Sequence, residues 1–280
     1  MSFHSVNCRG NIIALTSPQI MGILNITPDS FSDGGLYNTQ VSAIRHAADL
    51  VADGAAVLDI GAQSTRPNAE KITAAEERKR LRHIIPEIRK EFPSVLISLD
   101  TFWSDVVKFG YDEGIDIVND ISAGQFDPEM FKTVAHTGLP YILMHVHTSY
   151  ETMHNQNFSG DIILEINRML TEKTEELLAL GVKDIIWDPG FGFGKTVAQQ
   201  LQMTEDFQFI GFGKWPLLAG ISRKSFIYKP LEKGPLDIND ETQELHLKLL
   251  QKGACFLRVH DAAAARKTLE EFLHENPSVL

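Results

Sequence analysis

Three polar side chains with acceptor oxygens stand at the ends of apolar runs and could bind a polar ring. They are Asp100, Asn119 and Asp188. An ionised carboxylate accepts hydrogen bonds but cannot donate them, so this set suits a flat heterocycle that carries several N–H and NH2 donors. The alternative is local: Asp100 would cap the next helix and Asp188 would stabilise the turn at Pro189.

Three cations and a histidine follow other apolar runs and could bind an anion. They are Arg66, Lys224, Arg258 and His260. Parallel barrels commonly bind phosphate at the loops after strands seven and eight, where a helix N-terminus adds partial positive charge. A surface salt bridge is the usual alternative for an arginine. Because these cations emerge where the runs end, we favour a phosphate or carboxylate ligand.

Eight apolar runs must position these side chains. The runs are Ile20–Leu24, Ala56–Ile60, Val95–Leu99, Ile115–Val118, Tyr141–Met144, Asp184–Trp187, Leu217–Ile221 and Cys255–Val259. Continuous hydrophobicity of this length is typical of strands buried on both faces of a parallel sheet. The amphipathic segments between them include Val41–Ala52, Ala74–Glu91, Trp103–Tyr111, Ile162–Leu180, Asp240–Gln251 and Ala262–Leu273.

This alternation predicts an α/β protein with a (β/α)8 TIM barrel, preceded by a short N-terminal β-hairpin or lid within Asn7–Leu15. An open, doubly wound sheet is the alternative. In a barrel, the loops after the carboxyl ends of the strands form the active site, so the polar residues above would converge on one mouth.

Length and charge limit the classes of protein. The chain has 280 residues, 26 basic and 37 acidic, and a formal net charge of −11. We expect one domain over residues 1–280, with no nucleic-acid or membrane partner, because such surfaces need clustered Lys and Arg. Two cysteines, no signal-peptide pattern and no run of about 18 apolar residues predict a soluble, cytoplasmic protein. A small, locally basic pocket remains compatible with the acidic total.

Two motifs suggest other chemistry. The glycine-rich segment 188–196 ends in Gly-Lys-Thr, but Pro189 stands where a P-loop needs glycine, so a tight turn close to a ligand is the better interpretation. His145 and His147 share one strand face at a spacing that can bind zinc. With Asp261 they could form a metal-dependent barrel hydrolase, although no third histidine ligand is evident.

Seven motifs, in order over almost the whole chain, resemble those of the dihydropteroate synthase family. They are Met21–Gly35, Asp59–Pro67, Ser98–Thr101, Ile117–Asp120, Asp188–Lys195, Ser222–Ser225 and Arg258–Asp261. The resemblance implies condensation of 6-hydroxymethyl-7,8-dihydropterin pyrophosphate with p-aminobenzoate, giving 7,8-dihydropteroate and pyrophosphate in folate biosynthesis. It also implies Mg2+ as cofactor, a homodimer, and competition of sulfonamides with p-aminobenzoate.

The resemblance also implies residue roles by position in the motifs. Pterin-binding residues would be Asp100, Asn119, Asp188 and Lys224. Pyrophosphate-binding residues would be Asn25, Thr65, Arg66, Arg258 and His260, with Asn25 also a ligand of Mg2+. Residues that bind p-aminobenzoate would be Phe31, Thr65, Pro67, Phe193, Lys224 and Ser225. Residues acting in catalysis would be Asp33, Thr65, Arg66 and Lys224.

The implied chemistry agrees with these residue types. A departing pyrophosphate gains negative charge, so Arg258, His260 and Mg2+ would stabilise the transition state more than the ground state. Asp33 could stabilise cationic character at the pterin methylene. The neutral aromatic amine then attacks, with no covalent enzyme intermediate.

The second motif departs from the family pattern at Ala62 and Gln63, where a glycine and a glutamate are usual, and at Asn68, where glycine is usual. Two rival functions use the same barrel. One is a methyltransferase that passes the methyl group of methyltetrahydrofolate to a corrinoid protein, and the other is a non-catalytic pterin-binding paralogue. The long first motif and Ser64–Pro67 argue against both.

Overall fold

The protein was analysed as a computed structural model that describes residues 4–26, 35–64, 69–147, 149–153 and 157–277, without the side chains of 35–39. Several predicted site residues lie outside these ranges, namely Phe31, Asp33, Thr65, Arg66 and Pro67, as does the unusual Asn68.

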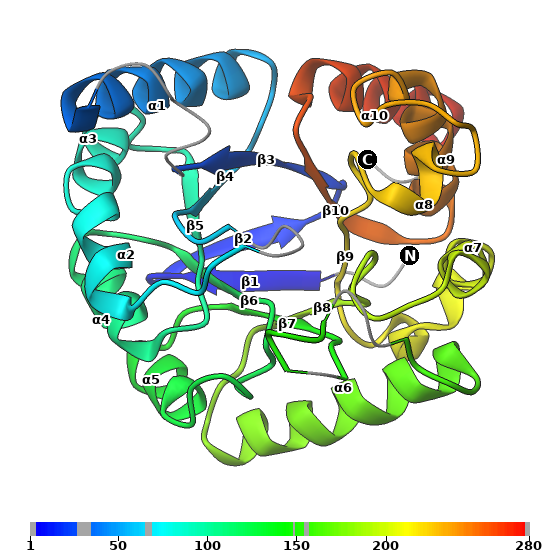
Figure 1. Ribbon diagram of the computed structural model, residues 1–280, viewed down its shortest axis with the longest axis horizontal. Helices are drawn as coiled ribbons and strands as arrows, with labels where there is room; N and C mark the ends of the chain where they lie inside the picture. Colours follow the sequence, from blue (N-terminus) through cyan, green and yellow to red (C-terminus); the bar gives the residue numbers. More distant parts are fainter. Residues whose placement is uncertain (1–3, 27–34, 65–68, 148, 154–156, 278–280) are drawn as a thin grey trace.

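Eight parallel strands close into a barrel in the order β10-β3-β4-β5-β6-β7-β8-β9 (Figure 1). Their bounds are β3 Gln19–Asn25, β4 Val57–Gly61, β5 Leu96–Asp100, β6 Ile117–Asp120, β7 Tyr141–Met144, β8 Ile185–Asp188, β9 Leu217–Ala219 and β10 Ala254–Val259. The predicted (β/α)8 barrel is therefore confirmed. Each strand begins and ends within a few residues of its predicted apolar run.

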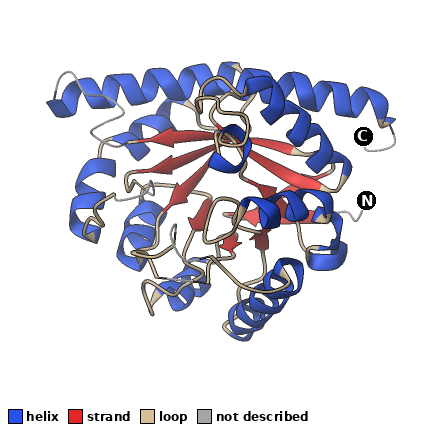
Figure 2. Ribbon diagram, turned by 45° about the vertical axis from the view of Figure 1, so that its right-hand side comes forward, coloured by secondary structure: helices blue, strands red, loops and turns tan. Residues whose placement is uncertain are grey.

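Helices surround the strands on the outside of the barrel (Figure 2). Their bounds are α1 Gly35–Ala52, α2 Ala74–Leu81, α3 Ile84–Glu91, α4 Ser104–Asp112, α5 Met130–Thr137, α6 Ile162–Ala179, α7 Val197–Glu205, α8 Ser225–Tyr228, α9 Asn239–Gln251 and α10 Ala262–Glu275. The main apolar core lies between this layer and the strands, where side chains such as Leu58, Leu99 and Leu143 are buried.

The helix predicted over Ala74–Glu91 is wrong in one respect, because the structure divides it into α2 and α3. Pro86 explains the break. A proline lacks the N–H that an interior helical residue donates, and it is tolerated in the first turn. Beginning a new helix at Ile84 places Pro86 in that first turn.

The N-terminal extension is the predicted hairpin, formed by β1 His4–Cys8 and β2 Asn11–Leu15. Arg9 and Gly10 make the turn with φ of 53° and 90°, which matches the two positive φ angles of a type I′ hairpin. The hairpin is not a lid over the predicted mouth. Its side chains Val6 and Leu15 pack against residues near the amino ends of the strands, including Met21 and Val57.

No helix in the described ranges is long and apolar enough to cross a membrane.

Candidate active site

The register of the sheet brings the predicted pterin residues to one end of the barrel. Asn25 pairs with Gly61, Gly61 with Asp100, and Asp100 with Asn119 across three neighbouring strand pairs. Because all strands are parallel, these residues lie at the same carboxyl edge. The predicted convergence is thus observed for Asn25, Asp100 and Asn119.

Arg258 connects two carboxylates inside this mouth. Its Nε donates to Asp59 Oδ2 at 2.6 Å and its Nη2 to Asp100 Oδ2 at 2.7 Å. Asn119 Nδ2 also donates to Asp59 Oδ2, at 3.1 Å. Charge-assisted bonds of this length are among the strongest in proteins. They fix the guanidinium and both carboxylates without a ligand.

Asp59 is a site residue that the residue-by-residue analysis missed. Its side chain is fully buried in the middle of β4, whose other residues are apolar. A lone acid within a strand buried on both faces was the available signal, since a buried charge is costly unless it is paired. Barrel geometry draws attention to residues at strand ends, and Asp59 lies two residues before the end of β4.

The local alternatives for the two aspartates have different outcomes. Asp100 does not cap α4, whose first N–H, from Ser104, instead donates to Asp127 Oδ2 at 2.8 Å. Asp188 does stabilise its turn, because Oδ1 accepts the Gly190 N–H at 2.7 Å. The other oxygens, Asp100 Oδ1 and Asp188 Oδ2, accept no hydrogen bond from the described residues. Each carboxylate is therefore held through one oxygen and offers the other.

The glycine-rich segment after β8 is a tight turn, as predicted. A Cβ on Gly190 would lie 2.2 Å from the His145 carbonyl oxygen, and one on Gly192 would lie 2.8 Å from Lys224 Cδ. Both glycines also have positive φ, of 71° and 83°. Only glycine allows this approach. The turn therefore sets where the Lys224 side chain can lie.

Lys224 lies beside an aromatic ring and close to opposite charges. Its Nζ is 4.5 Å from the ring centroid of Phe193. Burial, followed by the nearby Arg258, lowers the pKa of Lys224 to about 8, while Asp188 and Asp100 oppose the shift. Burial also raises the pKa of Asp100 to about 7, against the opposing effect of Arg258. Ser225, the predicted benzoate ligand, is the first residue of α8.

Lys195 holds the turn from inside, because its ammonium donates to backbone carbonyl oxygens. Its buried Nζ donates to the carbonyl oxygens of Gly190 at 2.8 Å and Phe193 at 3.0 Å. Burial lowers the pKa of Lys195 to about 7, with Asp188 opposing. The lysine of the apparent Gly-Lys-Thr motif thus supports the segment that carries Phe193.

The histidine pair does not form a metal centre within the described residues. The His145 and His147 rings stack with centroids 6.3 Å apart. Asp261 Oδ1 accepts the Ala264 N–H at 2.9 Å as the cap of α10. Across the described ranges, no group of three His, Cys, Asp or Glu residues is placed to hold a metal. The described residues therefore give the hydrolase alternative no support.

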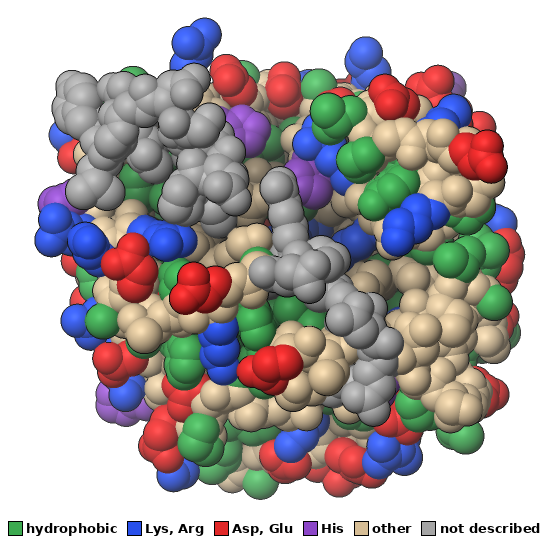
Figure 3. Space-filling model, viewed as in Figure 1, with side chains coloured by type: hydrophobic (Ala, Val, Ile, Leu, Met, Phe, Trp, Pro, Cys, Tyr) green, Lys and Arg blue, Asp and Glu red, His purple; other side chains and the backbone are tan. Residues whose placement is uncertain are grey.

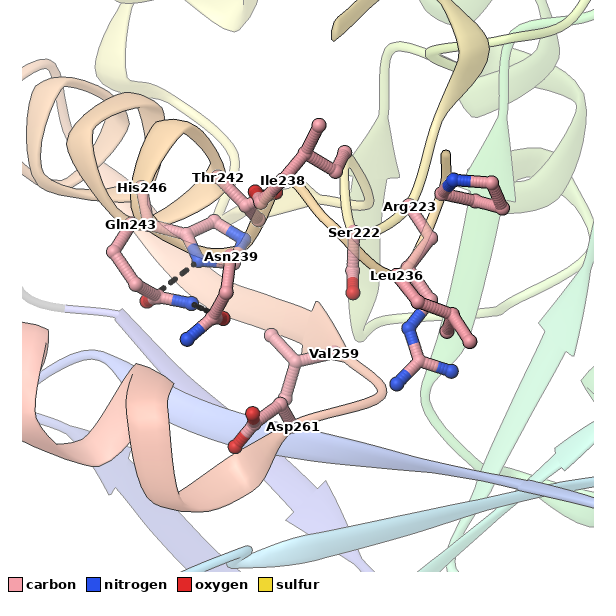
Figure 4. A pocket seen from close by; sticks show the side chains of 11 residues that line it. Ser222, Arg223, Leu236, Ile238, Asn239, Thr242, Gln243, His246, Val259 and Asp261 are labelled. Atoms are coloured by element: carbon pink, nitrogen blue, oxygen red, sulfur yellow. Dashed lines mark hydrogen bonds between the residues drawn. The ribbon is translucent and has the colours of Figure 1, made fainter. Parts of the chain in front are cut away.

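His260 is linked to the loop after β9. Its Nδ1 lies 3.0 Å from Ser222 Oγ, which also accepts the His260 N–H at 3.2 Å. Ser222 borders a separate hollow between that loop, α9 and the end of β10 (Figure 4). The side chains drawn there include Arg223, Asn239 and His246, and the carboxylates of the mouth are not among them.

Side-chain charge is mixed over the face of the molecule in Figure 3. Lys, Arg and His side chains border a depression near the centre of that view.

One acidic side chain of a helix is buried. It is Glu77 of α2, whose Oε2 accepts a hydrogen bond from Thr101 Oγ1 at 3.2 Å. Burial raises the pKa of Glu77 to about 8.

Comparisons with known proteins identify this architecture as that of a class of pterin-binding barrels. Residues 21–260 match the family described as pterin binding enzyme, and the chain belongs to that family. The relatives that it resembles carry a more specific name. A dihydropteroate synthase of Haemophilus influenzae is 38% identical over 262 residues, which cover 91% of this chain and 93% of the relative.

Two solved structures agree with that similarity. A Xanthomonas albilineans dihydropteroate synthase with 4-aminobenzoic acid superimposes with a TM-score of 0.91 at 33% identity, covering 98% of each chain. A Yersinia pestis dihydropteroate synthase in complex with a sulfonamide drug also gives a TM-score of 0.91 at 33% identity, covering 98% of this chain and all of that one.

Proposed function

We propose that this protein is a dihydropteroate synthase, a transferase that joins 6-hydroxymethyl-7,8-dihydropterin pyrophosphate to p-aminobenzoate and releases pyrophosphate. The observation that carries the proposal is the set of fixed acceptors at the barrel mouth. Asp100 and Asp188 each have one oxygen held by the protein and one available. Together with Asn119 they suit the N–H and NH2 donors of a pterin.

Arg258 would act on the leaving group from a fixed position. Its bonds to Asp59 and Asp100 leave Nη1 without a hydrogen-bond partner among the described residues, so one edge of the guanidinium can bind an anion. A donor that is already oriented stabilises developing charge without reorganisation during the reaction. His260, held by Ser222, would assist it.

Mg2+ fits this mouth as a shared ion rather than as a protein-caged one. The Asn25 side chain ends β3 and has no hydrogen bond with the described residues, while the Asp59 and Asp100 carboxylates are paired with Arg258. Mg2+ commonly binds one or two protein oxygens together with substrate phosphates. Asn25 would hold the ion, which when bound neutralises charge on the pyrophosphate oxygens.

The amine substrate needs orientation more than activation, because the aromatic amine is neutral at pH 7 and nucleophilic as it stands. Phe193, Lys224 and Ser225 would line its site among the described residues. Phe31, Asp33, Thr65, Arg66 and Pro67 keep the roles that the resemblance implies. We further propose one catalytic domain over residues 1–280, a homodimer and a cytoplasmic location.

The test is turnover with purified protein. We expect 7,8-dihydropteroate from both substrates with Mg2+, loss of product after chelation, and recovery when Mg2+ is restored. A sulfonamide should raise the apparent KM for p-aminobenzoate without lowering kcat. Absence of product at saturating substrates would overturn the proposal. Pterin binding without turnover would then favour the non-catalytic paralogue, and methyl transfer to a corrinoid would favour the methyltransferase.

A further inference from the structure

One tyrosine hydroxyl joins the two sides of the loop after β4. Tyr150, which follows β7, lies 3.0 Å from the Ser64 carbonyl oxygen and 3.3 Å from the Ala69 carbonyl oxygen through its Oη. A single O–H is therefore shared by the residues that bracket positions 65–68.

Gln63, which lies two residues after the end of β4, also takes part in this arrangement. Its Oε1 accepts the Ile72 N–H at 2.8 Å, and because that N–H can only donate, the orientation of the amide is determined. Its Nε2 then faces three acceptors: the carbonyl oxygens of Ser64 and Glu70 at 2.7 Å and 3.0 Å, and Tyr150 Oη at 2.9 Å. The side chain is only 7% exposed.

Lys71, which follows positions 65–68 in the loop after β4, packs its ammonium among four aromatic rings. Its Nζ lies 4.7 Å from the ring centroid of Trp103, 5.1 Å from Phe102, 5.3 Å from Phe126 and 5.7 Å from Tyr150. Four rings within about 6 Å of one ammonium favour it through cation–π attraction. Since a lone cation–π contact is modest, the number of rings matters here.

Two of these rings belong to an apolar cluster that extends to the candidate active site. Phe102, Tyr150 and Phe193 belong to one buried apolar cluster. Phe193 is the residue whose ring lies beside Lys224. Residues 69–72 are thereby packed on the structure that positions the proposed benzoate site.

We propose that Gln63, Lys71 and Tyr150 are positioning residues for the reaction, which hold the two described ends of the loop after β4 in one arrangement relative to Phe193 and Lys224. We call these three residues the loop clasp. The inference rests on the proposed function, which assigns substrate contacts to residues between those ends. The loop clasp itself touches neither substrate, so it acts by orientation, as substrate-positioning groups do.

The first test is Tyr150→Phe, which removes one hydroxyl and keeps the ring near Lys71. We expect kcat/KM for p-aminobenzoate to fall about fivefold, as for one lost hydrogen bond, while the affinity for the dihydropterin pyrophosphate stays within about twofold. The matched control is Tyr111→Phe. Tyr111 lies in α4, and its ring contacts Arg9 in the turn of the β1–β2 hairpin. Equal kinetics for wild type and Tyr150→Phe would overturn the inference.

The second test is Gln63→Glu, which separates positioning from bulk stability. An ionised carboxylate would turn an oxygen toward three acceptors, whereas a protonated carboxyl regains one donor. We expect the ratio of variant to wild-type kcat/KM to rise as the pH is lowered from 8.5 to 6. A ratio independent of pH would contradict the inference. Hydrogen exchange at the Ile72 amide should be faster in the variant at high pH, and this readout needs no activity.

Lys71→Met tests the remaining member of the loop clasp if Tyr150→Phe fails to fold. It keeps an apolar chain among the rings and removes only the charge, so kcat/KM for p-aminobenzoate should fall about threefold. An inactive wild-type protein would overturn the proposed function and this inference together. An active wild type whose kinetics are matched by Tyr150→Phe, or by Lys71→Met in its place, would overturn the inference alone.

Discussion

The two ends of the barrel bury different chemistry. At the amino ends of the strands, Met21, Val57, Ile117 and Phe256 form an apolar cluster that the β1–β2 hairpin covers. At the carboxyl ends, the interior instead holds ion-paired and hydrogen-bonded polar groups, such as those joined by Arg258. One end is built as core and the other as a polar site.

The two ends contribute differently to stability and to function. Burial of apolar surface stabilises the fold directly. Buried charges offset their desolvation only when paired, and a hydrophobic replacement is often as stable. The paired groups at the carboxyl end are therefore best explained by function, and the amino end by stability. Substitutions at the two ends should separate these quantities.

The largest expected effect is on stability at the amino end. Phe256→Ala removes a ring that is 1% exposed and should lower the free energy of unfolding by about 3–5 kcal/mol. Urea unfolding measures the loss, and Phe256→Leu should lose much less. At a temperature where the variant is folded, its KM values should match those of wild type; a large change in KM would mean that the two ends are not independent.

Two aspartates at opposite ends of β8 give the next comparison. Asp184 directly precedes the strand, and Asp188 is its last residue. Asp188→Asn at the carboxyl end of β8 should reduce kcat/KM by about 100-fold, because a charged hydrogen bond to the substrate is weakened. Asp184→Asn, at the amino end, should leave it unchanged. Similar kinetics for the two variants would show that position on the strand does not determine function here.

A pH effect of about one order of magnitude is expected from Lys224. Its pKa of about 8 means that the ammonium loses its positive charge as the pH rises above 8, so a charge-assisted hydrogen bond to the pterin becomes a weaker neutral one. Affinity for the dihydropterin pyrophosphate should then fall by up to about tenfold per pH unit. Lys224→Arg keeps its charge and should show a flat profile from pH 8 to 9.5. Calorimetric titration across this range tests both profiles.

A further pH effect, on stability rather than on kinetics, is expected from Glu77, a buried acid of α2. Its folded pKa of about 8 lies above the ordinary value of 4.5, so the folded state binds the proton more tightly. This contribution is complete below about pH 4.5 and is lost as the pH rises toward 8, by at most about 1.4 kcal/mol per pH unit. Glu77→Gln should flatten that part of the dependence of stability on pH. Parallel slopes for variant and wild type between pH 5.5 and 8 would refute it.

Periodicity made the barrel predictable. Continuous apolar runs indicated strands buried on both faces, and their number and spacing indicated closure. The helices α5 and α7 were not predicted as separate segments, because short helices with few buried residues give weak periodicity. The division at Pro86 was missed although the proline was visible.

The site was predictable where its residues follow strand ends, since barrel geometry brings those positions together. Asp59 lies inside a strand, and its pairing with Arg258 spans 199 residues of sequence. Lys195 lies in a Gly-Lys-Thr sequence that resembles the end of a P-loop. Its hydrogen-bond partners are nevertheless backbone carbonyl oxygens, which only the folded turn brings close to it. The hydrogen-bond partners of Asp59 and Lys195 therefore cannot be predicted from the neighbouring sequence.

The sequence by itself determined the barrel, the order of its motifs and the residue types at its mouth, because these follow from periodicity and from short segments. Tertiary structure alone decided which charges pair, that the hairpin covers the end opposite the mouth, and that Gln63, Lys71 and Tyr150 meet. The physical reason is that pairing depends on the register of parallel strands and on loops from different strands packing together. Those contacts join positions far apart in the chain, and their energies arise only once the barrel has closed.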